Sequence, residues 1–460
     1  MSGPLPAQER VLPTLNADGS RRRIHPRLYK GRLYTARLIT AWGLIALFVG
    51  LPFLHINGKP ALLLDVTGRE FSFFGRTFLA TDGMLLMLLM ITIFLSVIWL
   101  TALVGRAWCG WGCPQTVYME FVFRPIERLF EGGRADQIKL DKQGLSLRRA
   151  LKYPAFLLLS ILVANVFLAY FVGVERLWQW MQKSPAEHPV GFLVMGVTAA
   201  LVMFDFAYFR EQMCTVVCPY ARLQSVLLDD RSLIVGYDKQ RGEPRSKGKA
   251  KPGEDAGDCI DCNACVVTCP TGIDIREGLQ LECITCTQCI DACNSIMHKI
   301  GKPPGLIRYG SQTSLETGAR TRIARPRAFI YPALIGVFAS ALVFFLMRGQ
   351  SADVMLLRGI GAPYVVQGDG IRNQLRVKIE NRSPATHRYQ LELVGATDIK
   401  LIAPENPLSV AAGSHETTTI FLVVPKASFK QGKRPLKLRV SDGAEFSTEL
   451  DYQLLGPQDG

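Results

Sequence analysis

Several signatures of organic redox cofactors are missing from this chain. None of its six histidines falls in an apolar run long enough to cross a membrane, so no histidine pair can hold a haem there. The chain has no Cys-x-x-Cys-His motif for covalently attached haem and no glycine-rich nucleotide fingerprint after a strand. We therefore expect any electron transfer to proceed without haem and without a flavin or nicotinamide of its own.

Cysteine is absent from residues 294–460, so no disulfide can form there. Apolar and polar residues alternate over 375–379 and 389–393, and further strands are expected near 415–424, 435–440 and 446–453. This period of two is typical of strands with one buried face. We expect residues 348–460 to form an immunoglobulin-like β-sandwich with an ordinary apolar core, which docks a partner or stabilises the chain.

Long apolar runs occupy much of the rest of the chain, which is 48% hydrophobic overall. A helix needs about 20 apolar residues to cross a bilayer core of roughly 30 Å. Five runs are long enough, at 38–54, 84–104, 153–174, 189–209 and 328–347. The net charge of +14 does not indicate a nucleic-acid partner, because Lys and Arg stand in short groups beside these runs. We predict a polytopic α-helical protein with five transmembrane helices in a lipid bilayer.

The basic residues also predict the side of the membrane that each connection occupies, because short loops rich in Lys and Arg stay in the cytoplasm. Residues 1–37 carry eight and 105–152 carry nine, whereas 55–83 and 175–188 carry three and two. The basic N-terminal segment shows no small-residue cleavage site, so we expect no cleaved signal. The N-terminus, 105–152 and 210–327 are then cytoplasmic, and the β-sandwich is periplasmic.

All 12 cysteines fall in the segments predicted to be cytoplasmic, as suits thiols that stay reduced or metal-bound. Eight of them form two copies of C-x2-C-x2-C-x3-C, namely Cys259, Cys262, Cys265 and Cys269, followed by Pro270, and Cys283, Cys286, Cys289 and Cys293, followed by Asn294. Bacterial ferredoxins use this spacing for two [4Fe-4S] clusters, and the fourth cysteine of each copy binds the other cluster.

By that rule a first cluster takes Cys259, Cys262, Cys265 and Cys293, and a second takes Cys269, Cys283, Cys286 and Cys289. Asn294 stands where the pattern usually has proline, which we expect to weaken the turn after Cys293 without removing a ligand. A pair of zinc sites is the alternative, but zinc needs neither the triplet nor its repetition. We expect the ferredoxin segment at 258–300, between a flexible linker at 238–257 and a basic connector at 301–327.

The other four cysteines form two C-x3-C-P motifs, each just beyond a predicted span. They are Cys109 and Cys113, followed by Pro114, and Cys214 and Cys218, followed by Pro219. If the helix continues through each motif, both thiols share one face and the proline bends or ends the helix. The two pairs could meet as four soft ligands for iron, a cluster or copper(I), or they could simply be small packing residues.

One acidic residue, Asp205, lies inside the fourth span. Carboxylates within a membrane usually face a cavity or a partner. Asp205 is therefore a candidate for proton or quinol chemistry, with simple contact to interfacial water as the equal alternative.

The order of these parts resembles the FixG/CcoG/RdxA family of cytochrome oxidase accessory proteins. The resemblance covers a basic segment at 1–37, a four-helix region at 38–237 with both C-x3-C-P motifs, the double ferredoxin motif, the fifth span and the cysteine-free sandwich. It implies a cupric reductase of the bacterial inner membrane that supplies Cu(I) to the copper centre of cbb3-type cytochrome c oxidase.

The resemblance also implies roles for the cysteines. The eight ferredoxin cysteines would hold the electron carriers, and Cys109, Cys113, Cys214 and Cys218 would handle copper or receive electrons. Oxidase assembly factors or copper chaperones would be partners, together with an electron donor that the sequence does not identify. Self-association of the chain stays open.

Two other functions are compatible with the same motifs. The first is a quinol dehydrogenase of the kind that serves periplasmic nitrate or nitrous oxide reductases, which similarly combines C-x3-C-P pairs with ferredoxin clusters. The second is a metal-bound scaffold for oxidase assembly that has no redox activity.

Overall fold

The computed structural model describes most of the 460 residues. The described residues are 14, 20–56, 59–66, 70–73, 76–79, 83–144, 146–246, 256–318, 326–347, 351–359, 361–368, 370–383, 385–443 and 446–457. The chain divides into two compact units, residues 1–342 and 343–460. Each unit is described by itself.

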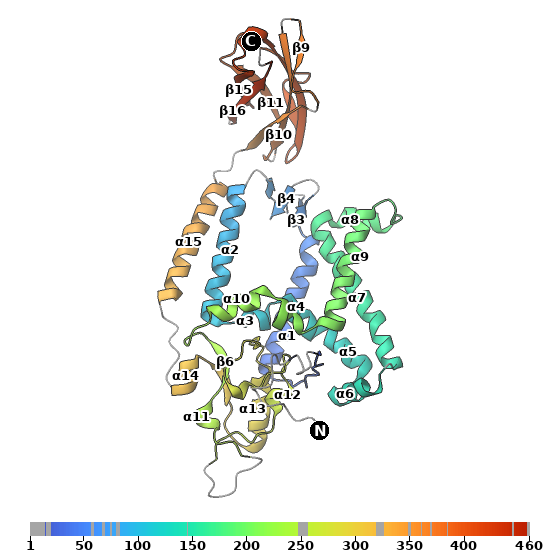
Figure 1. Cartoon of the computed structure of the whole chain (residues 1–460), viewed down its shortest axis with the longest axis vertical. Helices are drawn as coiled ribbons and strands as arrows, with labels where there is room; N and C mark the ends of the chain where they lie inside the picture. Colours follow the sequence, from blue (N-terminus) through green and yellow to red (C-terminus); the bar gives the residue numbers. More distant parts are fainter. Residues whose placement is uncertain are drawn as a thin grey trace. The chain divides into compact units, whose positions relative to one another are not determined.

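Five helices are long and apolar enough to cross a membrane. They are α1 (Arg32–Gly50), continued by the 3-10 turn η2 (Leu51–Phe53), α2 (Gly83–Val104), α7 (Leu147–Val172), α9 (Pro189–Phe204), continued by the π-helical turn η4 (Asp205–Phe209), and α15 (Pro326–Met347) (Figure 1). Their number and positions agree with the five apolar runs of the sequence.

Two of these helices begin before the apolar runs do. Helix α1 starts at Arg32 rather than at residue 38, and the Asp291 carboxylate accepts hydrogen bonds from the backbone N–H groups of Leu33 (3.4 Å) and Tyr34 (2.7 Å). Helix α7 starts before residue 153, at a cap formed by the Ser146 hydroxyl. Both ends are extended by side chains that satisfy N–H groups of the first turn, which apolar periodicity does not reveal.

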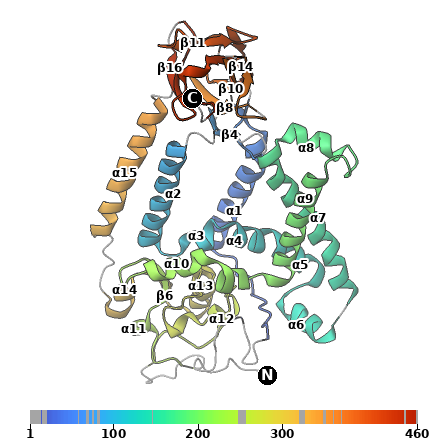
Figure 2. The ribbon, with the colours of Figure 1, turned by 45° about the horizontal axis from the view of Figure 1, so that its top comes forward.

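The spans lie side by side in two groups. Helix α7 packs along α9, and α2 runs beside α15, as both views show (Figures 1 and 2). The Trp99 indole N–H of α2 donates to the Ala328 carbonyl of α15 at 3.4 Å. The Tyr170 hydroxyl of α7 donates to the Phe48 carbonyl of α1 at 2.6 Å. Many large apolar side chains on these helices are exposed in the isolated chain, as expected where lipid covers them.

The connections at one end of the spans carry short strands and a helix. These are β1 (His55–Ile56), β2 (Lys59–Pro60), β3 (Leu62–Asp65), β4 (Glu70–Phe73), β5 (Arg76–Leu79) and α8 (Val174–Met181). The two connections contact each other, because Arg176 pairs with Asp65 at 3.2 Å and His55 pairs with Glu175 at 3.1 Å.

Short helices and turns follow α2 and α9 at their other end. They are α3 (Ala107–Trp111), α4 (Pro114–Tyr118), the π-helical turn η3 (Met119–Phe123), α5 (Arg124–Glu131), α6 (Arg134–Gln143), the π-helical turn η5 (Met213–Val217) and α10 (Pro219–Leu227). These elements place both C-x3-C-P motifs beside the ferredoxin segment.

The ferredoxin segment is framed by a two-stranded antiparallel sheet. Strand β6 (Ile234–Tyr237) pairs with β7 (Ile307–Gly310). The elements around and between them are α11 (Lys239–Gly242), α12 (Ala264–Val267), the 3-10 turn η6 (Ile275–Glu277), α13 (Gln288–Ile300) and α14 (Gln312–Thr317). The folded segment is therefore wider than 258–300, because both strands of this sheet lie outside that range.

Part of the expected linker and connector is also structured. Helix α11 lies within 238–257, and the Arg241 guanidinium pairs with Asp258 at 2.5 Å. Residues 247–255 of the linker and 319–325 of the connector lie outside the described residues. Local composition rich in Lys and Gly did not indicate that the flanks of the linker pack against the cysteine motifs.

The C-terminal unit consists of two sheets packed face to face. One has the order β12-β14-β10-β8, with β9 also paired to β10, and the other has the order β13-β11-β15-β16. The strands are β8 (Ala352–Arg358), β9 (Val365–Gln367), β10 (Gly370–Asn381), β11 (His387–Val394), β12 (Lys400–Ile402), β13 (Leu408–Val410), β14 (His415–Pro425), β15 (Lys433–Ser441) and β16 (Ser447–Leu455), with the 3-10 turn η7 (Lys426–Ser428) between β14 and β15.

The core of this unit comes from the residues that alternate along the strands. Leu375, Val377 and Ile379 of β10 are buried, as are Leu391 of β11 and Leu438 of β15. The sandwich thus follows the period of two in the sequence. The predicted fold class is confirmed: five helices able to span a membrane, a ferredoxin segment and a C-terminal immunoglobulin-like β-sandwich.

Candidate metal centres

The two ferredoxin motifs have the same backbone. In each, the residues on either side of the second cysteine are left-handed: Asp261 and Asn263 have φ of 49° and 56°, and Thr285 and Thr287 have φ of 55° and 62°. A left-handed backbone costs a residue other than glycine on the order of 1–3 kcal/mol and persists where function requires it. Such turns direct successive N–H groups into one concavity, which suits an anion.

The first cavity is lined by Cys259, Cys262, Cys265 and Cys293. Apolar side chains and the aliphatic part of Arg276 complete its wall. Cys262 is exposed, whereas the other three cysteines are buried. The structure thus brings together the four cysteines assigned to the first cluster, and it opens their cavity toward solvent at Cys262.

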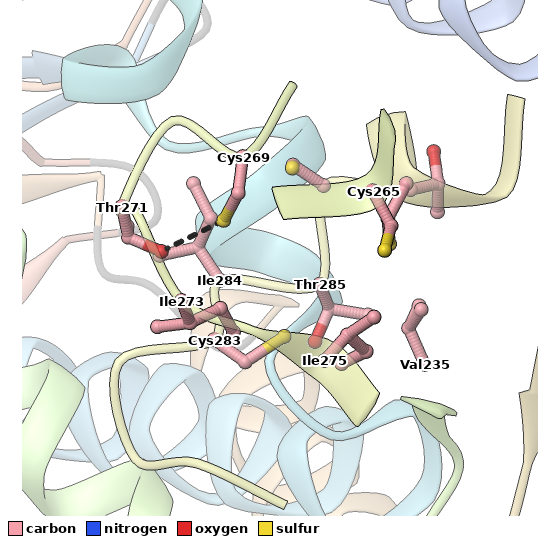
Figure 3. A pocket seen from close by; sticks show the side chains of 12 residues that line it. Val235, Cys265, Cys269, Thr271, Ile273, Ile275, Cys283, Ile284 and Thr285 are labelled. Atoms are coloured by element: carbon pink, nitrogen blue, oxygen red, sulfur yellow. Dashed lines mark hydrogen bonds between the residues drawn. The ribbon is translucent and has the colours of Figure 1, made fainter. Parts of the chain in front are cut away.

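The second cavity is lined by Cys269, Cys283, Cys286 and Cys289. Cys265 lines this cavity too, so the two cavities adjoin at that residue. Figure 3 shows Cys265, Cys269 and Cys283 around the second cavity, with the contact of 3.4 Å between the Cys269 Sγ and the Thr271 Oγ1 drawn as a dashed line. The four cysteines assigned to the second cluster are therefore also neighbours.

The donor sets fit iron–sulfur clusters better than single metal ions. Each cavity offers four thiols in a largely apolar wall, and thiolates are the usual ligands of such clusters. Zinc would need its thiolates at about 2.3 Å from one ion. Among the described residues, no three His, Cys, Asp or Glu side chains converge closely enough to hold a single ion. The spacing of the thiols leaves room for a larger inorganic group.

The residue after the second motif behaves differently from the expectation. Helix α13 continues from Gln288 through Asn294 to Ile300, so there is no turn after Cys293 for a proline to support. The Asn294 side-chain oxygen instead accepts a hydrogen bond from the Gly305 N–H at 2.9 Å. The expectation of a weakened turn was wrong, because the first motif ends in a turn at Pro270 and the second ends inside a helix.

The C-x3-C-P motifs also depart from the expected geometry. The spanning helices end before each motif, and both Pro114 and Pro219 occupy the first turn of a new helix, α4 and α10. Cys113 and Cys218 precede these helices with extended backbones. Proline is tolerated at the start of a helix, where its missing N–H has no partner to lose. The prolines therefore begin helices rather than bend or end them.

The two C-x3-C-P pairs lie together against the second ferredoxin motif. Cys109 packs in one buried cluster with Ile284 and Cys286, and Cys214 packs against it. Cys113 and Cys218 lie within electrostatic reach of Cys214. The Cys109 Sγ donates to the Gln224 Oε1 at 3.0 Å.

The four membrane-proximal thiols are thus gathered, but no three of them close on one ion in the described part of the chain. Burial raises the pKa of Cys109 to about 11 and that of Cys214 to about 12, so both carry a proton near neutral pH.

The contact between the membrane region and the second motif is close at Gly110. A Cβ atom there would lie 2.6 Å from the Ile284 carbonyl oxygen, 2.8 Å from that of Thr285 and 2.9 Å from the Cys286 Cα. Only glycine allows this approach of two backbones. The first C-x3-C-P loop therefore rests directly on the segment that leads to Cys286.

A buried ionic network lies within the membrane region, and one buried hydrogen bond joins this region to the second ferredoxin motif. Sequence reasoning singled out neither. Glu127 pairs with Arg210 at 2.5 Å and with Lys152 at 3.1 Å, and Gln288 donates to Glu120 at 3.1 Å. Burial alone would raise the pKa of Glu127, but Arg210 and Lys152 outweigh it and hold that pKa well below its usual range. Lys152 had been counted only as one of the basic residues of 105–152, and nothing in the spacing of these residues distinguishes a buried pair from a solvated one.

Asp205 has a partner beside the first C-x3-C-P motif. Its carboxylate accepts from the Gln115 side-chain N–H at 3.1 Å, and the same Gln115 nitrogen donates to the Arg210 carbonyl at 3.2 Å. Gln115, Arg210 and Cys214 line a third cavity. Other residues of its wall come from the two segments that carry the C-x3-C-P motifs and from the ferredoxin segment. The carboxylate thus faces protein rather than lipid.

Comparisons with known proteins agree with this architecture. Family models match residues 209–312 as a 4Fe-4S dicluster domain, residues 86–132 as a 4Fe-4S binding domain and residues 342–457 as the IG-like fold at the C-terminal of FixG. The chain is 30% identical to the nitrogen fixation protein FixG of Rhizobium meliloti, over 94% of this chain and 92% of FixG.

Two proteins of Cereibacter sphaeroides are similar over nearly the same length. The chain is 33% identical to protein RdxA, over 88% of this chain and 90% of RdxA. It is 32% identical to protein RdxB, over 90% of this chain and 91% of RdxB. The chain therefore belongs to the FixG family of membrane iron–sulfur electron-transfer proteins.

Proposed function

We propose that this protein reduces Cu(II) to Cu(I) for assembly of the copper centre of a cbb3-type cytochrome c oxidase. The observation that carries the proposal is the packing of Cys109 against Cys286, which joins a pair of membrane-proximal thiols to the second ferredoxin motif. The link to an oxidase rests on the resemblance to the FixG/CcoG/RdxA family that the motifs of the sequence show, and the likeness to FixG and RdxA supports membership of that family.

The eight ferredoxin cysteines are proposed as ligands of two [4Fe-4S] clusters. The first set is Cys259, Cys262, Cys265 and Cys293, and the second set is Cys269, Cys283, Cys286 and Cys289. Each cluster, when bound, would accept and release one electron at a time. Cys262 presents the first cavity to solvent, so a soluble electron donor approaches most closely there. Cys265 links this cavity to the second, and the second adjoins Cys109.

Copper would be the substrate at Cys109, Cys113, Cys214 and Cys218. One electron converts Cu(II), which prefers nitrogen and oxygen ligands, into Cu(I), which prefers thiolates. Because burial keeps Cys109 and Cys214 protonated, each thiol that binds Cu(I) releases a proton. Thiolate ligands therefore stabilise the product more than the reactant and favour reduction.

We further propose that the N-terminus and the ferredoxin segment face the cytoplasm of a bacterial inner membrane and that the sandwich faces the periplasm. Contacts within the first unit support a common side for the N-terminal and ferredoxin segments, since the Arg27 N–H donates to the Val267 carbonyl at 3.0 Å. Reporter fusions at each terminus test this placement: alkaline phosphatase should be active only at the C-terminus. Copper chaperones or oxidase assembly factors would meet the protein on either face.

The decisive experiment compares the two groups of cysteines in full-length protein purified anaerobically. A variant with Cys109→Ser and Cys214→Ser should keep its iron and sulfide yet lose Cu(II) reduction, measured with a Cu(I)-specific chelator. Cys286→Ser should lose iron as well as activity. Thr215→Ser, between the cysteines of the second pair, serves as the matched control. Copper reduction that survives in both cysteine variants would contradict the proposal.

A quinol dehydrogenase is the second candidate, and the Asp205–Gln115 pair favours it. The Asp205 carboxylate is held by Gln115, which lines a cavity together with Cys214, and it could receive a proton from a quinol bound there. Oxidation of a short-chain quinol by the purified protein, lost in Asp205→Asn and accompanied by no copper reduction, would select this function. A colourless protein with zinc and no reducible iron would instead support a scaffold without redox activity.

A further inference from the structure

One buried arginine of the first spanning helix forms no ion pair within 4.0 Å among the described residues. Arg37 is 1% exposed, and its guanidinium lies over the Phe121 ring at 5.4 Å. Its Nε donates to the Gly110 carbonyl at 3.0 Å. Both Nη atoms are buried and lack a hydrogen-bond partner in the part of the chain that the structure describes. A buried cation with unpaired donors is expensive unless an anion lies nearby.

The anion that suits Arg37 is the group bound by the second cavity. Arg37 lies within electrostatic reach of Cys286, and its partner Gly110 rests on the backbone of 284–286. Asp291 is also within electrostatic reach, but its carboxylate accepts from the N–H groups at the start of α1. A cluster with four thiolate ligands carries net negative charge, so it would supply what Arg37 lacks.

A second buried arginine lies near the same cavity, within electrostatic reach of one of its cysteines. Arg106 is 3% exposed, and its guanidinium donates to the Leu281 carbonyl. Its Nε has no partner among the described residues. Arg106 lies within electrostatic reach of Cys109 and of Cys283. Neither Arg37 nor Arg106 forms an ion pair with a carboxylate within 4.0 Å in the described residues, and no acidic residue lines the second cavity there.

The first cavity has the opposite arrangement. Arg276 lines it, but this guanidinium pairs with Asp261 at 2.6 Å and with Asp274 at 2.6 Å. Two carboxylates more than neutralise one cation. The two cavities therefore match in their cysteines and differ in the charge around them.

We propose that Arg37 and Arg106 raise the reduction potential of the second cluster above that of the first. Reduction adds one negative charge to a cluster, and an uncompensated cation in a site of low dielectric stabilises that charge. An electron that arrives at the solvent-facing first cavity would then settle at the second, beside Cys109. The proposal rests on the cluster assignment under the proposed function, and it holds whether copper or another acceptor follows.

The test is a potentiometric titration followed by EPR, on full-length protein purified anaerobically in detergent. Wild-type protein should show two midpoint potentials. Arg37→Met should lower the higher potential by at least about 59 mV, which is a tenfold change in the one-electron equilibrium between oxidised and reduced cluster. The lower potential should stay unchanged. Arg106→Met should lower the same potential. Arg37→Lys, which keeps the charge, should retain most of the wild-type value.

Arg308→Met is the matched control, because Arg308 belongs to the same segment but is partly exposed and paired with Asp238. Water and salt screen that charge, so both potentials should stay at their wild-type values. The proposal would be overturned if every arginine variant kept both wild-type potentials. It would also be overturned if only the lower potential shifted.

Iron and sulfide analysis separates the remaining outcomes. Loss of one cluster from Arg37→Met, Arg37→Lys and Arg106→Met alike would show a purely structural role and would also overturn the proposal. Wild-type protein without clusters would instead refute the assignment of the cysteines themselves.

Discussion

The two four-cysteine cavities are alike in backbone and unlike in surroundings. Both place left-handed residues around the second cysteine of a motif, and both are lined by at least four cysteines. The first contains the exposed Cys262, whereas Gly110 of α3 packs against the backbone that leads to Cys286 in the second. Arg276 beside the first is neutralised, but Arg37 beside the second is not.

The comparison shows that two parts of the sequence determine the properties of a duplicated motif: the motif itself and the distant segments that pack against it. Spacing within each motif sets the ligands and the backbone, so the two copies remain equivalent at that level. Segments from elsewhere in the chain set accessibility and charge. The second cavity receives its covering and its cations from α1 and from the first C-x3-C-P loop, and these make it the inner member of the pair.

The largest expected effect is a difference in loss of iron between the cavities. A bulky, water-soluble iron chelator should remove iron first from the cavity that contains the exposed Cys262. The covering loop should protect the cavity that contains Cys286. EPR of partly depleted samples would follow the two clusters separately, with unfolded protein as the control for equal access. Simultaneous loss from the folded protein would remove the distinction between outer and inner cavities.

A proline at position 294 should have the next largest effect, because the second motif continues into a helix. Asn294→Pro removes a helical hydrogen bond and clashes with the preceding turn, at a cost of about 3 kcal/mol in the free energy of unfolding. It also removes the hydrogen bond to Gly305. Chemical denaturation in detergent measures this loss.

The control is Pro270→Ala in the first motif, where the chain turns and no helix is interrupted. It should cost clearly less than Asn294→Pro. Equal losses would mean that the two motif ends are equivalent after all, contrary to the course of α13.

Much of this architecture follows from sequence patterns that have one physical solution. Runs of about 20 apolar residues can hardly be anything but membrane spans, and strict alternation after residue 370 gave the β-sandwich. The repeated cysteine triplets indicated which cysteines to expect as neighbours, and the structure places Cys265 and Cys293, 28 positions apart, in the lining of one cavity. In each case the signal is local in sequence and repeated.

The roles of Arg37 and Glu127 could not be predicted in the same way. Arg37 was counted among the basic residues that flank the first span, and it is instead buried within α1. Glu127 pairs with Arg210, which is remote in sequence. From composition alone, a charged side chain is assumed to face water. Only the fold shows which charged side chains are buried. The prolines of the C-x3-C-P motifs were misjudged because proline both ends one helix and begins the next.

A smaller effect is expected from the close approach that covers the second cavity. Gly110→Ala places a methyl group 2.6 Å from the Ile284 carbonyl oxygen, so one backbone must move away. Such overpacking costs typically about 1–3 kcal/mol. The cavity that contains Cys286 should then lose iron to the chelator faster.

Thr215→Ala is the matched control for Gly110→Ala. Thr215 holds the equivalent position in the second C-x3-C-P motif, and its hydroxyl donates to the Glu211 carbonyl of its own turn at 3.3 Å. This variant should leave the rate of iron loss unchanged. If both variants lost iron at the same rate, the close backbone contact at Gly110 would not protect the cavity that contains Cys286.

The smallest effect concerns the bond between the inner motif and the first span. Asp291→Ala removes the carboxylate that accepts from the Leu33 and Tyr34 N–H groups at the start of α1. Loss of such a cap costs about 1 kcal/mol, and it frees Arg37 to shift with the loosened helix end. Asp291→Asn keeps an acceptor and should cost less. Hydrogen exchange at the first turn of α1 should rise in Asp291→Ala while α13 stays protected. If amides of α13 exchanged equally fast, Asp291 would stabilise its own helix rather than join that helix to α1. The contact between α1 and the second motif would then not depend on this carboxylate.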